Sequence, residues 1–160
     1  MDDVKQNDLE YALDWYDYGI KNRDDAIIRF MMYWIAFNWL YSACEGEHDA
    51  DKIEEFCERY FDRLSGYPAF ETEEFEVLRQ KPIANVRTGG RNGWLRRRLY
   101  SDDELLRMKG LFRTIYHVRC NLFHGSKSIH NERDMNLVRA SGIILEGYLK
   151  ASLPDRSFFH

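Results

Sequence analysis

The stretch AIIRFMMYWIAFNWLY, residues 26–41, is apolar on nearly every side when it is drawn as a helix. A helix without a polar face is buried all round, so this stretch predicts the central helix of the fold. It is shorter than the roughly 18 apolar residues that span a bilayer, and it contains Arg29 and Asn38. We therefore expect a core helix and no membrane association. Asn38 must find a hydrogen bond there, either to a neighbouring helix or to the functional motif described below.

Capping patterns and apolar periodicity predict helices on both sides of this stretch, with almost no strand signal. Capping boxes are predicted at NDLE (7–10) and SDDE (101–104), while NRDD (22–25) and NERD (131–134) start two further helices. The result is a bundle of four to five helices, with a short helical segment added at 72–78. The main helices are expected at 7–21, 22–41, 51–64, 101–124 and 131–153.

The chain of 160 residues is the size of one domain with a sizeable core. We expect a single all-α domain over 1–160, with its core at about 8–152 and a tail at 154–160. The first residues are polar and acidic, unlike a signal peptide. The three cysteines form no CxxC pair, which predicts a reduced, cytoplasmic protein without a zinc site. We expect no cofactor.

Charge is unevenly distributed along the chain. The net charge is −4, yet residues 79–100 hold seven basic residues and no acidic one. This segment, rich in Gly and Arg, is predicted to be a long basic loop, which either binds RNA through phosphate contacts and base stacking or pairs with the acidic surface of the same molecule. It lacks the GxxxxGK[ST] pattern of a nucleotide-binding P-loop. The candidate RNA-binding residues are Arg87, Arg91, Arg96, Arg97 and Arg98, with Lys127 from a later loop.

The stretch YHVRCNLFHG, residues 116–125, carries an arginine and two histidines at the end of the predicted fourth helix. On an ideal helix Arg119 shares the apolar face, whereas His117, Asn121 and His124 lie opposite, so Arg119 and His124 are about 140° apart. Two ordinary interpretations are open: Arg119 reaches past the core edge to a carboxylate, and the other three form a solvated face. A sharper interpretation is cleavage of an RNA phosphodiester, in which a histidine transfers a proton and an arginine neutralises the phosphate.

Two motifs in their order resemble a known family. RCNLFH, residues 119–124, is an Arg-x4-His motif followed by Gly125, similar to that of HEPN domains. Upstream, WIAFN at 34–38 resembles the Trp-x-Ala-Phe-Asn helix of Apea-like HEPN proteins. The expected order also agrees, from an aromatic-rich second helix through an irregular middle to a long helix that ends in the motif. The resemblance covers about 8–152 and implies an HEPN-like fold.

The resemblance also implies a function. Members are mostly metal-independent endoribonucleases of prokaryotic defence, stress or toxin–antitoxin systems, active as homodimers with the motif at the dimer cleft. By that resemblance Arg119 and His124 are the catalytic pair, RNA is the substrate, and an antitoxin or regulatory protein is a partner. Cys120 stands where the family often has Asn, Asp or His, so Asn121 is the candidate for that support, with His117 and Asn38. Ser126 replaces a tyrosine typical of one toxin subgroup.

Two rivals follow from the same sequence. The first is a non-catalytic HEPN-like module that binds RNA or dimerises, and the second is a regulatory scaffold that does not contact RNA. Either Arg119 and His124 line one open cleft, which favours the enzyme, or Arg119 is buried against a carboxylate far from His124. If Arg119 and His124 line one cleft, either the helix end unwinds or a second copy of the chain completes the site.

Overall fold

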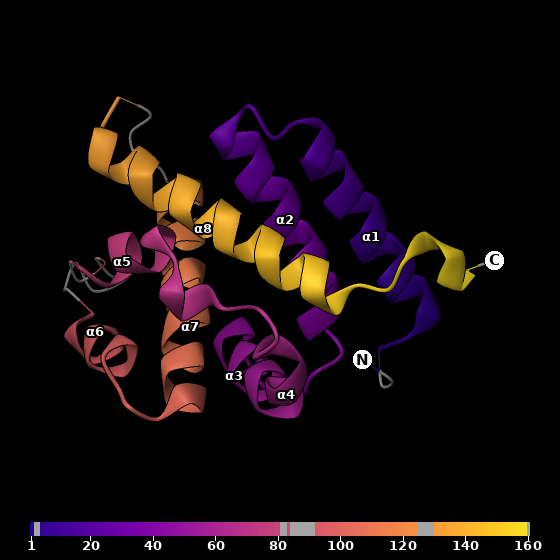
Figure 1. Ribbon diagram of the computed structural model, residues 1–160, viewed down its shortest axis with the longest axis horizontal. Helices are drawn as coiled ribbons and strands as arrows, with labels where there is room; N and C mark the ends of the chain where they lie inside the picture. The colour runs from indigo at the N-terminus through magenta and orange to yellow at the C-terminus, as the bar shows by residue number, and fades with distance from the viewer. Residues whose placement is uncertain (2–3, 81–82, 84–91, 125–129, 160) are drawn as a thin grey trace.

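The computed structural model is all-helical in the part of the chain that it describes, which excludes residues 2–3, 81–82, 84–91, 125–129 and 160 (Figure 1). Eight α-helices and two short 3-10 helices (η1, η2) are present there, more than the four to five helices predicted. The all-α prediction is confirmed. The elements are α1 Gln6–Lys21, α2 Ala26–Tyr41, α3 Asp49–Arg59, α4 Phe61–Leu64, η1 Ala69–Glu71, α5 Glu73–Arg79, α6 Gly93–Leu99, α7 Glu104–Phe123, α8 Glu132–Ser152 and η2 Arg156–Phe159.

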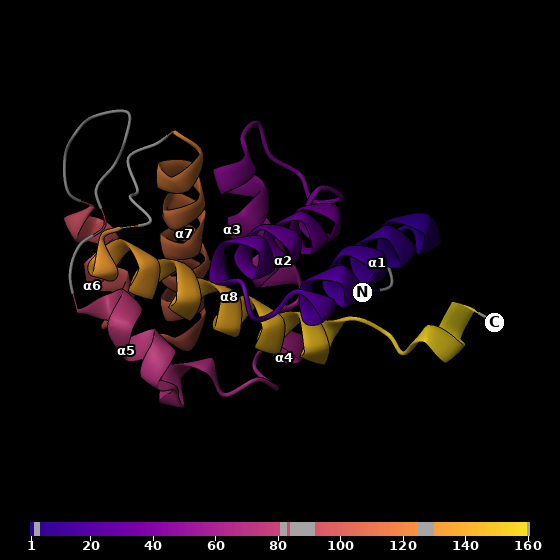
Figure 2. The same ribbon diagram turned by 90° about the horizontal axis from the view of Figure 1, so that it is seen from above.

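Three long helices form the centre of the bundle. α8 packs along α2, α2 packs against α1, and α7 lies beside α3 and α6, with α5 covering the first part of α8 (Figures 1 and 2). Phe37 of α2 stacks on Phe112 of α7 with ring centroids 4.9 Å apart, and Phe112 in turn contacts Tyr148 of α8 at 4.8 Å. The central position predicted for 26–41 is therefore confirmed by aromatic contacts to both other long helices.

The helix starts follow local capping chemistry, with three corrections. The second helix, expected from residue 22, begins only at Ala26. Asp25 caps α2 by accepting hydrogen bonds from the backbone N–H groups of Ile27 and Ile28, both at 2.9 Å. The predicted box at 7–10 is wrong, because α1 begins at Gln6 without a side-chain cap. The box at 101–104 is displaced by two residues, since Asp103 caps α7 and Ser101 instead accepts from the Asp103 N–H.

Two predicted segments differ from the structure. The helix expected over 51–64 is divided at Tyr60 into α3 and α4. The loop expected over 79–100 is wrong at 93–99, where α6 buries Leu95 and Leu99 against α7, because side chains four residues apart face the same way on a helix. Most of the remaining loop, 81–82 and 84–91, lies outside the described residues.

The segment predicted as a tail, 154–160, contains the short 3-10 helix η2. The Arg156 guanidinium donates hydrogen bonds to Asp14 at 2.9 Å and to Asp17 at 2.8 Å, which holds this segment beside α1. Figure 2 shows η2 extending past the end of α8 on the side of α1.

Candidate functional site

The last turns of α7, with His124 directly after them, carry the Arg-x4-His motif. The predicted apolar face is confirmed, because each of its first five members is at most 1% exposed and Leu122 is partly buried against the core. The five buried members are Met108, Leu111, Phe112, Ile115 and Val118.

The predicted solvated face of α7 is wrong for two of its three residues. His117 is 8% exposed and Asn121 is 1% exposed, because α3 and α6 pack on that side of the helix. Only His124 is exposed. Neighbouring helices cover α7 on several sides, so it has no broad solvent-exposed face. The burial of the polar side chains of His117 and Asn121 therefore requires a structural or functional explanation.

Arg119 is half-buried and has no carboxylate partner among the described residues. Its guanidinium carbon lies 5.9 Å from the ring centroid of Trp34 and 4.6 Å from that of Phe123. Its Nη1 lies 4.0 Å from the Cys120 sulfur, and its buried Nε has no hydrogen-bond partner in the described part of the chain. Aromatic contacts therefore orient this charge without neutralising it.

His124 lies just outside the helix. α7 ends at Phe123, and His124 follows with φ −85° and ψ 11°, its N–H donating to the Cys120 carbonyl oxygen at 3.0 Å. This φ is close to a helical value and the backbone bond to Cys120 is the helical one, so the Cβ direction of His124 departs little from that of an ideal helix. Both Arg119 and His124 line one cavity of about 560 Å³. The two residues are thus brought to one site within a single chain, despite an ideal separation of about 140°.

The opposite wall of this cavity consists of residues that the sequence did not single out. Glu47, His48, Asp49 and Ala50, from the end of the α2–α3 loop and the start of α3, line it across from α7. Neither the Glu47 nor the Asp49 carboxylate forms an ion pair or hydrogen bond within the described residues. The sequence EGEHDA is typical of a surface loop, so only the packing of α3 on α7 reveals this wall.

Arg113 and His117 lie deeper along the same cavity. Arg113 donates to Glu54 at 2.7 Å, and its guanidinium lies 5.2 Å from the ring centroid of Trp94. The His117 Nε2 atom is buried and has no hydrogen-bond partner in the described part of the chain. Burial, aided by the charge of Arg113, lowers the pKa of His117 to about 4, so this imidazole is neutral at pH 7.

Asn38 lies near the site but not in the cavity. It is half-buried beside Tyr41, whose fully buried hydroxyl also feels the charges of Asp49 and Arg119. Burial chiefly, and then Asp49, raises the pKa of Tyr41. Asn38 is therefore placed behind the site, and its supporting role stays a prediction.

The candidate RNA-binding residues separate into three groups. Arg96 and Arg97 are exposed on α6 and line a surface depression of about 460 Å³ with Gly93 and Tyr100. Arg98 is instead half-buried and donates to Glu54 at 2.9 Å. Arg87, Arg91 and Lys127 lie outside the described residues.

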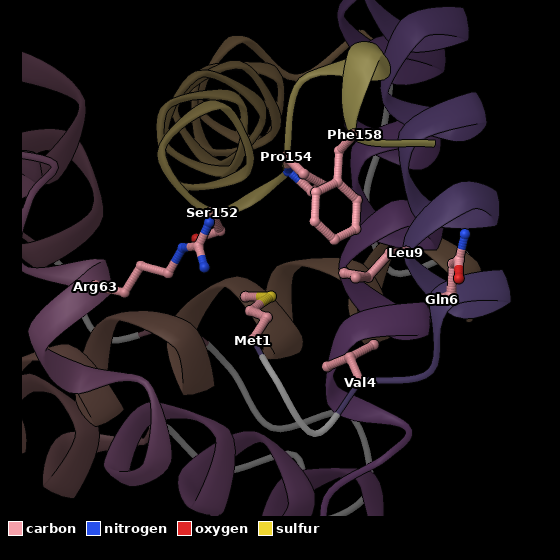
Figure 3. A pocket seen from close by; sticks show the side chains of 8 residues that line it. All are labelled: Met1, Val4, Gln6, Leu9, Arg63, Ser152, Pro154 and Phe158. Atoms are coloured by element: carbon pink, nitrogen blue, oxygen red, sulfur yellow. The ribbon is translucent and has the colours of Figure 1, made fainter. Parts of the chain in front are cut away.

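A second cavity lies near the chain termini, between Met1 and Phe158 (Figure 3). It has about 510 Å³ and lies between α1, α4 and the segment after α8. Most of its lining residues are apolar, with Gln6, Arg63 and Ser152 as the polar members, and the motif residues of α7 are not among them. The cavity beside α7 is therefore the better candidate for phosphate chemistry.

Within the described residues, no group of three or more His, Cys, Asp or Glu side chains is arranged to hold a metal ion. No helix in that part of the chain is long and apolar enough to cross a membrane. Comparison with known proteins gives no match to any protein-family model, curated protein or solved structure.

Proposed function

We propose that the chain is a metal-independent endoribonuclease of the HEPN type. The observation that supports it most directly is that Arg119 and His124 line one cavity, together with the buried His117, whose Nε2 atom has no hydrogen-bond partner among the described residues. Cationic and imidazole side chains that converge on one cavity suit phosphodiester cleavage, which needs charge neutralisation and proton transfer. The resemblance of the Arg-x4-His motif points to the same chemistry.

The roles follow from the chemistry of the side chains. The ribose 2′-oxygen attacks phosphorus and loses its proton, a 2′,3′-cyclic phosphate forms, and the 5′-oxygen leaves with a proton. His124 performs one of the two proton transfers, while His48 and His117 are the other imidazoles that line the cavity. Arg119 stabilises the charge that grows on the phosphate oxygens, since its guanidinium has no competing carboxylate in the described residues.

We propose further that the chain forms a homodimer, with the cavity at the cleft between the two copies. Phe123 is 53% exposed directly beside Arg119, which offers a second copy an apolar contact at the edge of the site. A defence or toxin–antitoxin setting, and a partner protein that restrains activity, belong to this proposal through the family resemblance alone.

The test is RNA cleavage by purified protein in excess chelator. His124→Ala is expected to abolish cleavage with fold and association state unchanged, because its side chain is exposed at a helix end. Arg119→Lys is expected to retain binding but to lose most of the rate, since an ammonium cannot give paired hydrogen bonds to a phosphate. Equal cleavage by wild type and His124→Ala, or no cleavage of any RNA, would refute the enzyme.

A non-catalytic RNA-binding module is the second candidate. It is favoured by the exposed Arg96 and Arg97 beside Tyr100, a combination of cations and an aromatic ring suited to single-stranded RNA. Binding without turnover, with no dependence on His124, would support this candidate over the enzyme.

A further inference from the structure

The cavity beside α7 has two walls of opposite charge that do not neutralise each other. Arg119 stands on one wall and the carboxylates of Glu47 and Asp49 on the other, yet no ion pair joins them in the described part of the chain. Opposite charges in one cavity that stay apart leave room for a ligand with an anionic end and a hydrogen-bond-donating end. A polyanion alone would be repelled by the acidic wall.

Unpartnered polar atoms mark the same cavity as a ligand site. His117 is only 8% exposed, and its Nε2 atom has no hydrogen-bond partner among the described residues. A buried polar atom without a partner costs free energy unless something satisfies it. The buried Nε atoms of Arg113 and Arg119 are also unpartnered within that part of the chain.

We infer that Glu47 and Asp49 recognise the base next to the scissile phosphate, and that this base is guanine. This inference rests on the proposed ribonuclease function. Guanine presents two adjacent donors, N1–H and the N2 amino group, which a carboxylate accepts together. Uracil presents a single donor, N3–H, between two carbonyl oxygens, and these two oxygens repel a carboxylate. Tyr116, half-buried in the same cavity, supplies an aromatic face for stacking.

The position of Asp49 suits this role. It occupies the first turn of α3. Its charge contributes, after burial, to the raised pKa of Tyr41, and, after burial and Cys120, to the raised pKa of Tyr116. Asp49 also lines the same cavity as Arg119 and His124 at the end of α7. Asp51, by contrast, accepts the His48 N–H at 3.2 Å and is already engaged at the helix start.

The first experiment measures binding of guanosine 3′-monophosphate and uridine 3′-monophosphate by calorimetry. The wild type is expected to bind the guanosine nucleotide at least about tenfold more tightly, because one good paired contact discriminates bases by this order. In Glu47→Gln/Asp49→Asn the preference is expected to fall to within about threefold, while uridine nucleotide binding persists. That persistence shows that the variant is folded.

The matched control is Asp62→Asn, which removes one exposed carboxylate of α4 that does not line the cavity. It should leave the nucleotide preference unchanged. Equal affinities for both nucleotides in the wild type, no binding of either nucleotide, or an undiminished preference in the double variant would overturn the inference.

Cleavage of uridine oligonucleotides with and without one internal guanosine separates this inference from the proposed function. Cutting beside guanosine supports both. Cutting without base preference refutes the guanine inference and leaves the ribonuclease in place. A guanosine preference in binding without cleavage of any RNA refutes the ribonuclease but still supports recognition of guanine by Glu47 and Asp49.

Discussion

The Glu54 carboxylate on α3 accepts a hydrogen bond from the Arg113 guanidinium on α7 at 2.7 Å. The same oxygen accepts from Arg98 on α6 at 2.9 Å, so one acidic side chain joins three helices behind the cavity. The Trp94 ring lies 4.9 Å from the Arg98 guanidinium carbon and 5.2 Å from that of Arg113. These contacts of Glu54 and Trp94 hold Arg113 in its position at the cavity.

Glu54→Gln is expected to lower the free energy of unfolding by about 1–3 kcal/mol, because two half-buried guanidinium groups lose their charged acceptor. RNA cleavage should slow several-fold, since Arg113 would no longer be held at the cavity. Denaturant unfolding and a cleavage time course measure the two effects. The control is Glu58→Gln on the same helix, which removes a 56% exposed carboxylate paired with Lys109 and should cost less than about 1 kcal/mol.

Gly110→Ala is expected to push α6 away from α7. A Cβ atom at Gly110 would lie 2.7 Å from the Arg98 Cβ and 3.3 Å from its backbone carbon, so part of the strain falls on the main chain. Overpacking of this kind costs about 1–3 kcal/mol. At Gly142 an added Cβ meets only ordinary contacts of 3.5 Å or more, so Gly142→Ala should be neutral or stabilising. Thermal unfolding of both variants tests this contrast, and equal melting temperatures would contradict it.

His117→Gln is expected to change how stability depends on pH. The folded pKa of about 4 lies below the ordinary 6.5, first because of burial and then because of Arg113. The unfolded chain therefore binds a proton below about pH 6.5 while the folded one does not, and wild-type stability falls as the pH drops from about 6.5 to 4. The glutamine variant should lose this part of the slope. Denaturant titrations across this range would show identical slopes if the prediction were wrong.

Glu146→Gln is expected to destabilise the packing of α8 on α2 at neutral pH. Burial alone would raise the pKa of Glu146, but hydrogen bonds from Tyr33 and Arg29 outweigh burial and lower it. A carboxyl with a lowered folded pKa stabilises the fold above its unfolded pKa and loses this effect as the pH falls through the folded value. The deficit of the variant, about 1–3 kcal/mol at pH 7, should therefore shrink in acid. A constant deficit down to pH 3 would contradict this.

Arg96→Gln/Arg97→Gln is expected to weaken binding of single-stranded RNA without affecting the fold, because both side chains are exposed. Loss of two phosphate contacts should reduce the slope of log affinity against log salt by about 1.4. Arg98→Gln should instead lower stability, because Arg98 is paired with Glu54. The control double variant Arg133→Gln/Arg139→Gln removes two exposed charges from α8, and an equal effect on binding would show that the α6 site is not specific.

Much of the helical framework could be predicted from local chemistry. Asn131 caps α8 where the sequence indicated, and the burial of Phe37 follows from a helix without a polar face. The NRDD stretch also starts a helix, although α2 begins after its last residue, Asp25. α6 could not be predicted, since seven residues with three arginines form a helix only when Leu95 and Leu99 have α7 to pack against. The burial of His117 depends equally on neighbours that are distant in the sequence.

The sequence by itself determined an all-α chain, a buried central helix and an arginine and a histidine at a helix end, because capping and apolar periodicity act over a few residues. Only the tertiary structure decided that Arg119 and His124 line one cavity, and that Glu47 and Asp49 form its other wall. The physical reason is that a cavity is made by the packing of separate helices. Here the end of α7 meets the start of α3, and no local pattern in the sequence records that meeting.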